Sequence, residues 1–145
     1  MSEPRPDRAA AAELVAAAGR LQAAVDASGW RLVTWLTGMA VATVLYLSGL
    51  GVAGRSDAGV LAMSGAFGVC VAVLCLATLP GAAVFRAGME RRLTRTMLAW
   101  ALVFGAAMAL GLTVFRGSLV YWLVAALAAG LPLAVGARAE ARLGR

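Results

Sequence analysis

Four long stretches without a single charged residue constrain this chain more than any other feature. They cover residues 32–54, 58–85, 96–115 and 117–137. A helix rises 1.5 Å per residue, so about 20 apolar residues cross the roughly 30 Å hydrocarbon core of a bilayer. The sequence therefore predicts four transmembrane helices, with spans at about 32–54, 58–80, 96–115 and 117–137.

Composition points in the same direction. The chain has 145 residues, of which 62% are hydrophobic and 14% charged, and its mean hydropathy is +0.86. Soluble domains are about 45–50% apolar and about 25% charged, and a domain of this length has too little interior to bury the excess. We expect an all-α polytopic membrane protein, with its four helices paired as two antiparallel hairpins behind an N-terminal cytoplasmic amphipathic helix.

The arginines predict the orientation. Eleven of the 13 basic residues lie in the N-terminal segment, between the second and third spans, or at the C-terminus, and only Arg55 and Arg116 lie on the other side. The positive-inside rule then places both termini in the cytoplasm. Tyr46 and Trp122 are expected at the outer interface. The chain lacks Lys, Asn and Ile, whose codons are AT-rich, which indicates a GC-rich bacterial genome and hence a bacterial plasma membrane.

Residues 1–29 form a cytoplasmic segment ahead of the transmembrane domain, residues 30–145. The segment is rich in alanine and is predicted to be helical. A narrow apolar stripe recurs along it at steps of three and four residues, formed by Leu14, Ala18, Leu21 and Val25. The stripe is either a docking or coiled-coil seam, or the inner face of a loosely held surface helix.

Small residues recur every four positions in three spans. Such rows let helix backbones approach closely in lipid. They serve either packing within the monomer or contact with a second copy or a partner. The candidate packing residues are Ser64, Gly68 and Ala72; Ala101, Gly105 and Ala109; and Ala126, Gly130 and Ala134.

Two further features lie toward the predicted cytoplasmic side. The loop between the second and third spans carries an arginine cluster, formed by Arg86, Arg91, Arg92 and Arg95. The cluster is a candidate contact for anionic lipid or a partner, or it serves only to keep the loop inside. Candidate kinks are Pro80 with Gly81, and Gly130 with Pro132, although both sites also suit plain helix endings.

The two predicted hairpins also resemble each other. Arg31 and Trp35 stand at the start of the first as Arg95 and Trp100 stand at the start of the second, and both even-numbered spans contain a Leu-Pro pair near their end, followed by an arginine. A tandem duplication would place two similar hairpins about an axis along the membrane normal.

Reactive chemistry is scarce. No span contains an ionisable Asp, Glu or Arg, and the chain has no His, so proton relays, metal sites and nucleophile–base sets lack their usual residues. Aromatic platforms for nucleic acid are also absent. We expect no enzyme, no cofactor, no metal and no nucleic acid, and a non-catalytic accessory component that contacts the lipid bilayer and forms a homo-oligomer or joins a larger membrane assembly. The alternatives are a transporter, flippase or pore for lipid-like or amphiphilic solutes, and a membrane-disrupting effector.

Overall fold

Four helices make up the computed structural model, which describes residues 8–78 and 88–143. They are α1 (Arg8–Ala53), α2 (Asp57–Thr78), α3 (Met89–Thr113) and α4 (Leu119–Leu143). Each is long and apolar enough to cross a membrane. The prediction of an all-helical chain with four apolar helices is therefore confirmed, and this fits a multi-pass membrane protein.

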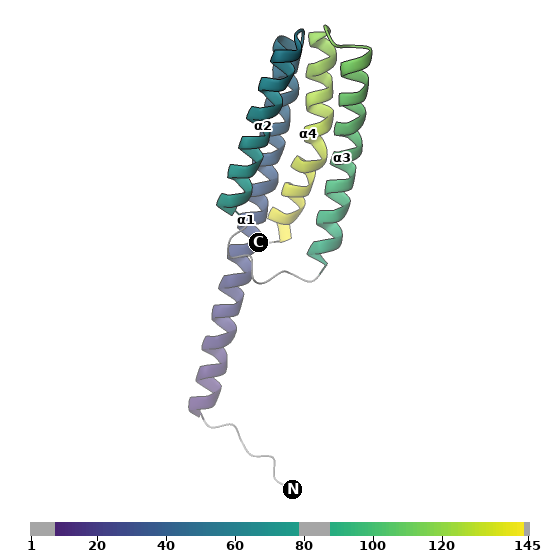
Figure 1. The fold of residues 1–145 in the computed structure, drawn as a ribbon. Helices are drawn as coiled ribbons and strands as arrows, with labels where there is room; N and C mark the ends of the chain where they lie inside the picture. Colours follow the sequence, from purple (N-terminus) through teal and green to yellow (C-terminus); the bar gives the residue numbers. More distant parts are fainter. Residues whose placement is uncertain (1–7, 79–87, 144–145) are drawn as a thin grey trace.

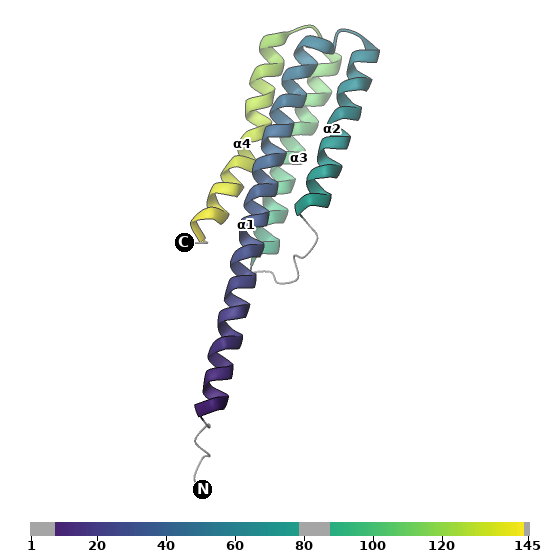
Figure 2. The same ribbon diagram turned by 90° about the vertical axis from the view of Figure 1, so that its left-hand side faces the viewer.

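Helix α1 is far longer than a bilayer is thick. Its 46 residues correspond to about 69 Å, roughly twice the hydrocarbon core. The second half packs in the bundle, and the first half projects from it as a straight extension (Figures 1 and 2). The helix expected in residues 1–29 is thus not a separate element, because no proline interrupts the chain from Arg8 to Ala53 and Gly29 lies within the helix.

The four helices surround the bundle axis with one open edge. Helix α1 packs against α2 and α4, and α3 packs against α4. Over the described residues, no Cα atom of α2 comes within 8 Å of one in α3, and the two helices lie on opposite sides of the bundle in Figure 1. A two-fold axis relating the hairpins would make the α1–α4 and α2–α3 contacts equivalent. The observed packing is therefore not two-fold symmetric.

The core runs along the contact between α1 and α4. Buried residues recur every three or four positions in both helices, as helix packing requires. Small residues of α4 permit a close approach: a Cβ atom on Gly130 would lie 2.9 Å from Val44 Cγ2 of α1. The buried residues include Leu36, Met39, Thr43, Tyr46, Leu47 and Leu50 of α1, and Trp122, Ala126, Ala129, Leu133 and Ala137 of α4.

The burial of Tyr46 and Trp122 corrects one expectation. Trp122 has a relative exposure of 0% and Tyr46 of 5%, so both pack inside the bundle instead of facing the membrane interface. Each satisfies its polar atom internally. Trp122 Nε1 donates to the carbonyl of Arg116 at 3.4 Å, and the Tyr46 hydroxyl pairs with that of Ser64 at 3.0 Å.

Aromatic rings bridge the open edge between α2 and α3. The Phe67 ring of α2 stacks on Tyr46 of α1 with centroids 4.7 Å apart, and on Phe104 of α3 at 6.0 Å. Phe104 in turn stacks on Trp100 at 5.1 Å. The Trp100 indole N–H donates to the buried Thr43 hydroxyl at 3.2 Å. Side chains therefore connect two helices whose backbones remain apart.

The two short turns are joined at the end of the bundle opposite the start of α3 and the end of α4. Arg116, in the α3–α4 turn, donates from Nε to the carbonyl of Gly54 at 3.1 Å and forms an ion pair with Asp57. Ser118 accepts a hydrogen bond from the Tyr121 N–H and so caps α4, as a serine before a helix is expected to do. In α2 the capping oxygen belongs to Ser56, which accepts from the Gly59 N–H at 3.1 Å.

Helix boundaries differ from the predicted spans at the opposite, arginine-rich end. Helix α3 begins at Met89, after Gly88 with φ 76°, so Arg91, Arg92 and Arg95 lie on its first turns and not in a loop. Helix α4 continues through Pro132 to Leu143, so the alternative of a plain helix ending at Pro132 is wrong. Flanking turns maintain the helix even though a proline has no N–H to donate.

Candidate functional site

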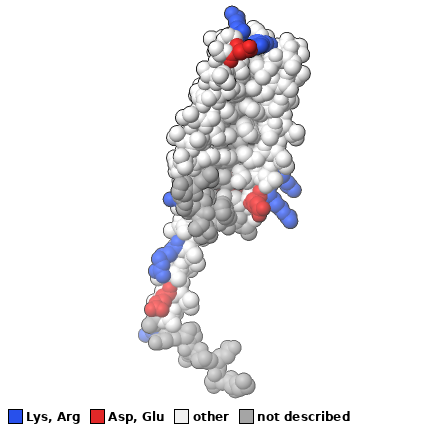
Figure 3. Space-filling view, viewed as in Figure 1, with Lys and Arg blue, Asp and Glu red and all other residues white. Residues whose placement is uncertain are grey.

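Charge in this molecule is confined to its ends. In Figure 3 the blue and red side chains gather at the two ends of the bundle and along the projecting part of α1, and the face between them is uncharged. The arginine-rich end combines the start of α3 with the end of α4. The candidate site lies here, where polar groups meet an apolar helix bundle.

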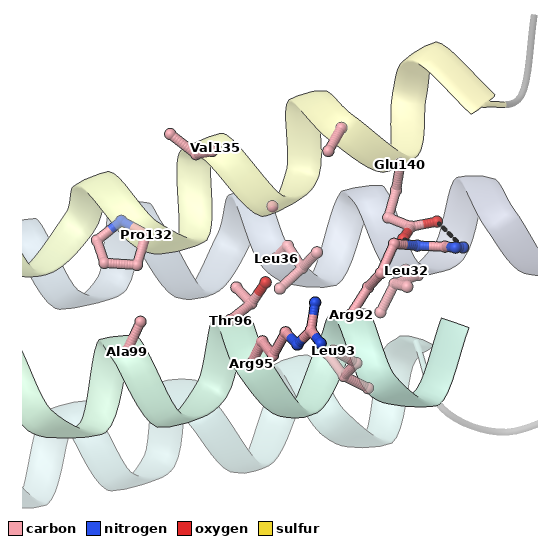
Figure 4. A pocket seen from close by; sticks show the side chains of 12 residues that line it. Leu32, Leu36, Arg92, Leu93, Arg95, Thr96, Ala99, Pro132, Val135 and Glu140 are labelled. Atoms are coloured by element: carbon pink, nitrogen blue, oxygen red, sulfur yellow. Dashed lines mark hydrogen bonds and ion pairs between the residues drawn. The ribbon is translucent and has the colours of Figure 1, made fainter. Parts of the chain in front are cut away.

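A half-open cavity of about 340 Å³ lies between α1, α3 and α4 at this end (Figure 4). Ligand-binding pockets usually have volumes of about 300–1,000 Å³, so this cavity lies at the lower end of that range. A small side chain contributes to the space, because Ala99 occupies a lining position where a larger residue would fill it. Its apolar walls include Leu32, Leu36, Leu93, Pro132 and Val135, and its polar residues are Arg92, Arg95, Thr96 and Glu140.

An ion pair closes one end of the cavity. Arg92 Nε donates to Glu140 Oε1 at 2.6 Å, and Arg92 Nη2 reaches the other carboxylate oxygen at 3.5 Å. The Glu140 side chain is 6% exposed and the Arg92 side chain is 39% exposed. Because a buried carboxylate requires a partner, this pair ties the last turns of α4 to the first turns of α3.

Arg95 and Thr96 also line the cavity, but among the described residues neither takes part in an ion pair of this kind. Arg95 is exposed and makes no hydrogen bond or ion pair with the part of the chain that the structure describes. Thr96 packs against Gly136, where a Cβ atom would lie 2.7 Å from its methyl group. Other threonines, such as Thr78 and Thr113, donate to a carbonyl four residues earlier. The Thr96 hydroxyl has no partner of this kind among the described residues.

Only some of the arginines in the predicted cluster line the cavity. Arg92 and Arg95, three residues apart on α3, both line the cavity, whereas Arg91 is exposed and lies outside it. Arg86 falls outside the described residues. Glu140 is the functional residue that sequence reasoning missed. The sequence feature that could have indicated it is its position as the single acidic residue among the arginines that follow the last span.

The two candidate kinks differ in what can be described. Pro80 and Gly81 lie outside the described residues. Pro132 lines the cavity, and beyond it the yellow, C-terminal part of α4 leans away from α1 (Figure 2). Gly130, two residues closer to the α3–α4 turn, is instead buried against α1. Proline and glycine thus serve different contacts.

The three rows of small residues have different surroundings. Ala126 and Gly130 are buried in the contact with α1, so their row packs within the monomer, although Ala134 is exposed. The row Ala101, Gly105 and Ala109 is exposed throughout. In the α2 row, Ser64 bonds to Tyr46, and Gly68 and Ala72 are exposed.

The N-terminal stripe has no described contact with the bundle. Leu14 is 68% exposed and Leu21 is 61% exposed; Ala18 is also exposed, and Val25 is half-buried near the start of the bundle. No group of three metal-binding side chains occurs among residues 8–78 and 88–143. Cys70 and Cys75 are free thiols on α2.

Comparison with known proteins adds no relative. No protein-family description, curated protein or solved structure matches this chain.

Proposed function

We propose that this chain is a non-catalytic membrane component that self-associates or joins a larger membrane assembly. The observation that carries the proposal is the state of α2, none of whose residues is buried within the monomer. Its inner stripe, which includes Met63, Phe67 and Leu74, packs against the cores at half-burial. The remaining faces are open to lipid or to another helix.

The open side of α2 suits a second helix. Gly65 and Gly68 lie there, and a Cβ atom on either would meet nothing within 4 Å. In lipid, where apolar surface alone gives no driving force, glycine-bearing faces support association because backbones can approach closely. The free extension of α1, with Leu14 and Leu21 exposed, offers a second contact outside the membrane.

Energy transfer between two tagged copies in native membranes tests this proposal. Full-length chains carrying donor and acceptor fluorophores at the C-terminus should show transfer above that of an unrelated membrane protein at equal density. Gly68→Leu should reduce this transfer by at least half by preventing close approach. Val73→Leu, an exposed position on the same helix that already bears a large side chain, is the matched control. A monomer that copurifies with no partner would contradict the proposal.

The proposed topology has both termini in the cytoplasm of a bacterial cell. It is supported by the distribution of arginines, since the arginine-rich end brings together the start of α3 and the end of α4. Cysteines placed at Arg55 and Arg142, in a chain with Cys70 and Cys75 replaced by serine, provide the test. A membrane-impermeant thiol reagent added to intact cells should label only the first position. Labelling of the second position would indicate the opposite orientation and would contradict the proposed topology.

A second candidate is movement of a lipid-like solute, and the half-open cavity beside Pro132 favours it. Purified chain in vesicles containing fluorescent phospholipid should then speed the transfer of label between leaflets. A rate equal to that of protein-free vesicles would exclude this function and leave the first proposal intact.

A further inference from the structure

The lining of the cavity at the arginine-rich end changes from charged to apolar along the helix axes. Figure 4 shows the Arg92–Glu140 pair at one end, Arg95 and Thr96 in the middle, and Ala99 opposite Pro132 at the other end. The backbone positions of Arg95 and Ala99 are about 6 Å apart along the axis of α3, so the lining changes from a guanidinium-bearing residue to an apolar one within about one helical turn. A ligand that fits this gradient carries an anion joined directly to a hydrocarbon chain.

The charges around the cavity further restrict the class of ligand that it can bind. The Arg92 guanidinium and the Glu140 carboxylate neutralise each other at 2.6 Å. Among residues 8–78 and 88–143, nothing compensates the positive charge of Arg95, and the neighbouring Thr96 hydroxyl has no hydrogen-bond partner. A phosphodiester carries one negative charge, and its oxygens match the paired N–H donors of a guanidinium.

The mouth of the cavity lies on the outer surface of the bundle. Val135 lines the cavity and is 60% exposed, and Ala99 and Ala139 are also exposed. A molecule could therefore enter sideways from the bilayer, between α3 and α4. The helices on both sides are apolar enough to lie in a membrane.

We propose that this cavity binds one anionic phospholipid, with its phosphate on Arg95 and Thr96 and an acyl chain along Ala99 and Val135. The site is independent of the proposed self-association, because it uses neither α2 nor the N-terminal extension. Among the arginines of the predicted cluster, it assigns the lipid contact to Arg95. Arg92 acts by holding Glu140.

Native mass spectrometry of the detergent-solubilised full chain, titrated with phosphatidylglycerol, tests the site. One lipid should bind more tightly than the rest, and more tightly than phosphatidylcholine. Arg95→Gln should weaken that first binding about fivefold, since a basic residue near anionic lipid contributes about 1 kcal/mol. Arg91→Gln removes an exposed arginine of the same helix that lies outside the cavity, and should change binding less than twofold.

A second pair of variants tests the acyl chain and does not depend on charge. Ala99→Leu fills the apolar end of the cavity and should also weaken the first binding, whereas Ala101→Leu, on an exposed face of α3 outside the cavity, should not. Equal losses in Arg95→Gln and Arg91→Gln would show diffuse attraction and overturn the proposal. Equal binding of soluble glycerol phosphate, unaffected by Ala99→Leu, would show a simple anion site and also overturn it.

Discussion

At the scale of single residues, the ion pair between Glu140 and Arg92 is a polar contact that joins α4 to α3 at the arginine-rich end. Glu140 has a relative exposure of 7%, and a carboxylate so far removed from water requires compensation by charge and hydrogen bonds. Arg92 supplies both through its Nε and Nη2 atoms. The pair is less costly than one buried on both sides, because the Arg92 side chain still reaches solvent.

Removal of either partner alone should therefore destabilise the bundle. Arg92→Met leaves the Glu140 carboxylate unpaired, and we expect the free energy of unfolding in detergent to fall by about 1–3 kcal/mol. The double variant Arg92→Met/Glu140→Met should recover most of this loss, because no buried charge remains. Arg91→Met serves as the control, with a change within about 0.5 kcal/mol. If Arg92→Met unfolded at the same denaturant concentration as the parent chain, the pair would have no structural role.

At the scale of elements, glycines on one helix have opposite roles. In α3, a Cβ atom on Gly111 would lie 2.6 Å from Trp122 Cζ2 and 2.9 Å from Tyr121 Cε1. Gly105, less than two turns away, has nothing within 4 Å. One glycine allows α3 and α4 to meet, and the other only lowers the helix propensity of an open face.

This difference predicts opposite effects of the same substitution. Gly111→Ala should lower the free energy of unfolding by about 1–3 kcal/mol, because the new methyl group must displace the Trp122 ring. Gly105→Ala should be neutral or should stabilise the monomer by about 0.5–1 kcal/mol, since alanine is the better helix former. Thermal unfolding of both variants in one detergent provides the measurement. Equal effects would mean that α3 and α4 do not pack as described.

At the scale of the whole molecule, α1 belongs both to the helix bundle and to the part that projects from it. One continuous helix runs from the projecting part, where Leu14 and Leu21 are exposed, into the contact with α4 (Figure 2). The projecting part is therefore joined to the bundle without a break in the helix. A flexible joint at Gly29 would remove that connection.

Spin labels can distinguish a continuous helix from a jointed one. With Cys70 and Cys75 replaced by serine, labels at Ala12 and Val41 should give a narrow distance distribution centred near 44 Å, about 1.5 Å for each intervening residue. Labels at Val41 and Val52, both exposed within the bundle part of α1, give the reference width. A broad and distinctly shorter distribution for the first pair would place a bend near Gly29.

The chain by itself was sufficient to predict the four apolar helices, since lipid requires about 20 uncharged residues per crossing and this signal is local. It also marked the arginine-rich end and both short turns. It predicted spans of 96–115 and 117–137 and left a plain helix ending at Pro132 as an alternative, whereas α3 begins at Met89 and α4 continues to Leu143, because neither charged residues nor a proline end a helix by themselves. Both helices extend beyond those marks into the region of the Arg92–Glu140 pair.

Only tertiary structure decided which of the chemically similar residues matter. The three described arginines of the cluster look alike in the sequence, but Arg92 is paired with Glu140, Arg95 lines the cavity without a partner among the described residues, and Arg91 lies outside the cavity. The rows of small residues look alike as well, and contact with Val44 buries one while another is open. Burial and pairing depend on neighbours up to 48 residues away along the chain, and no local pattern contains that information.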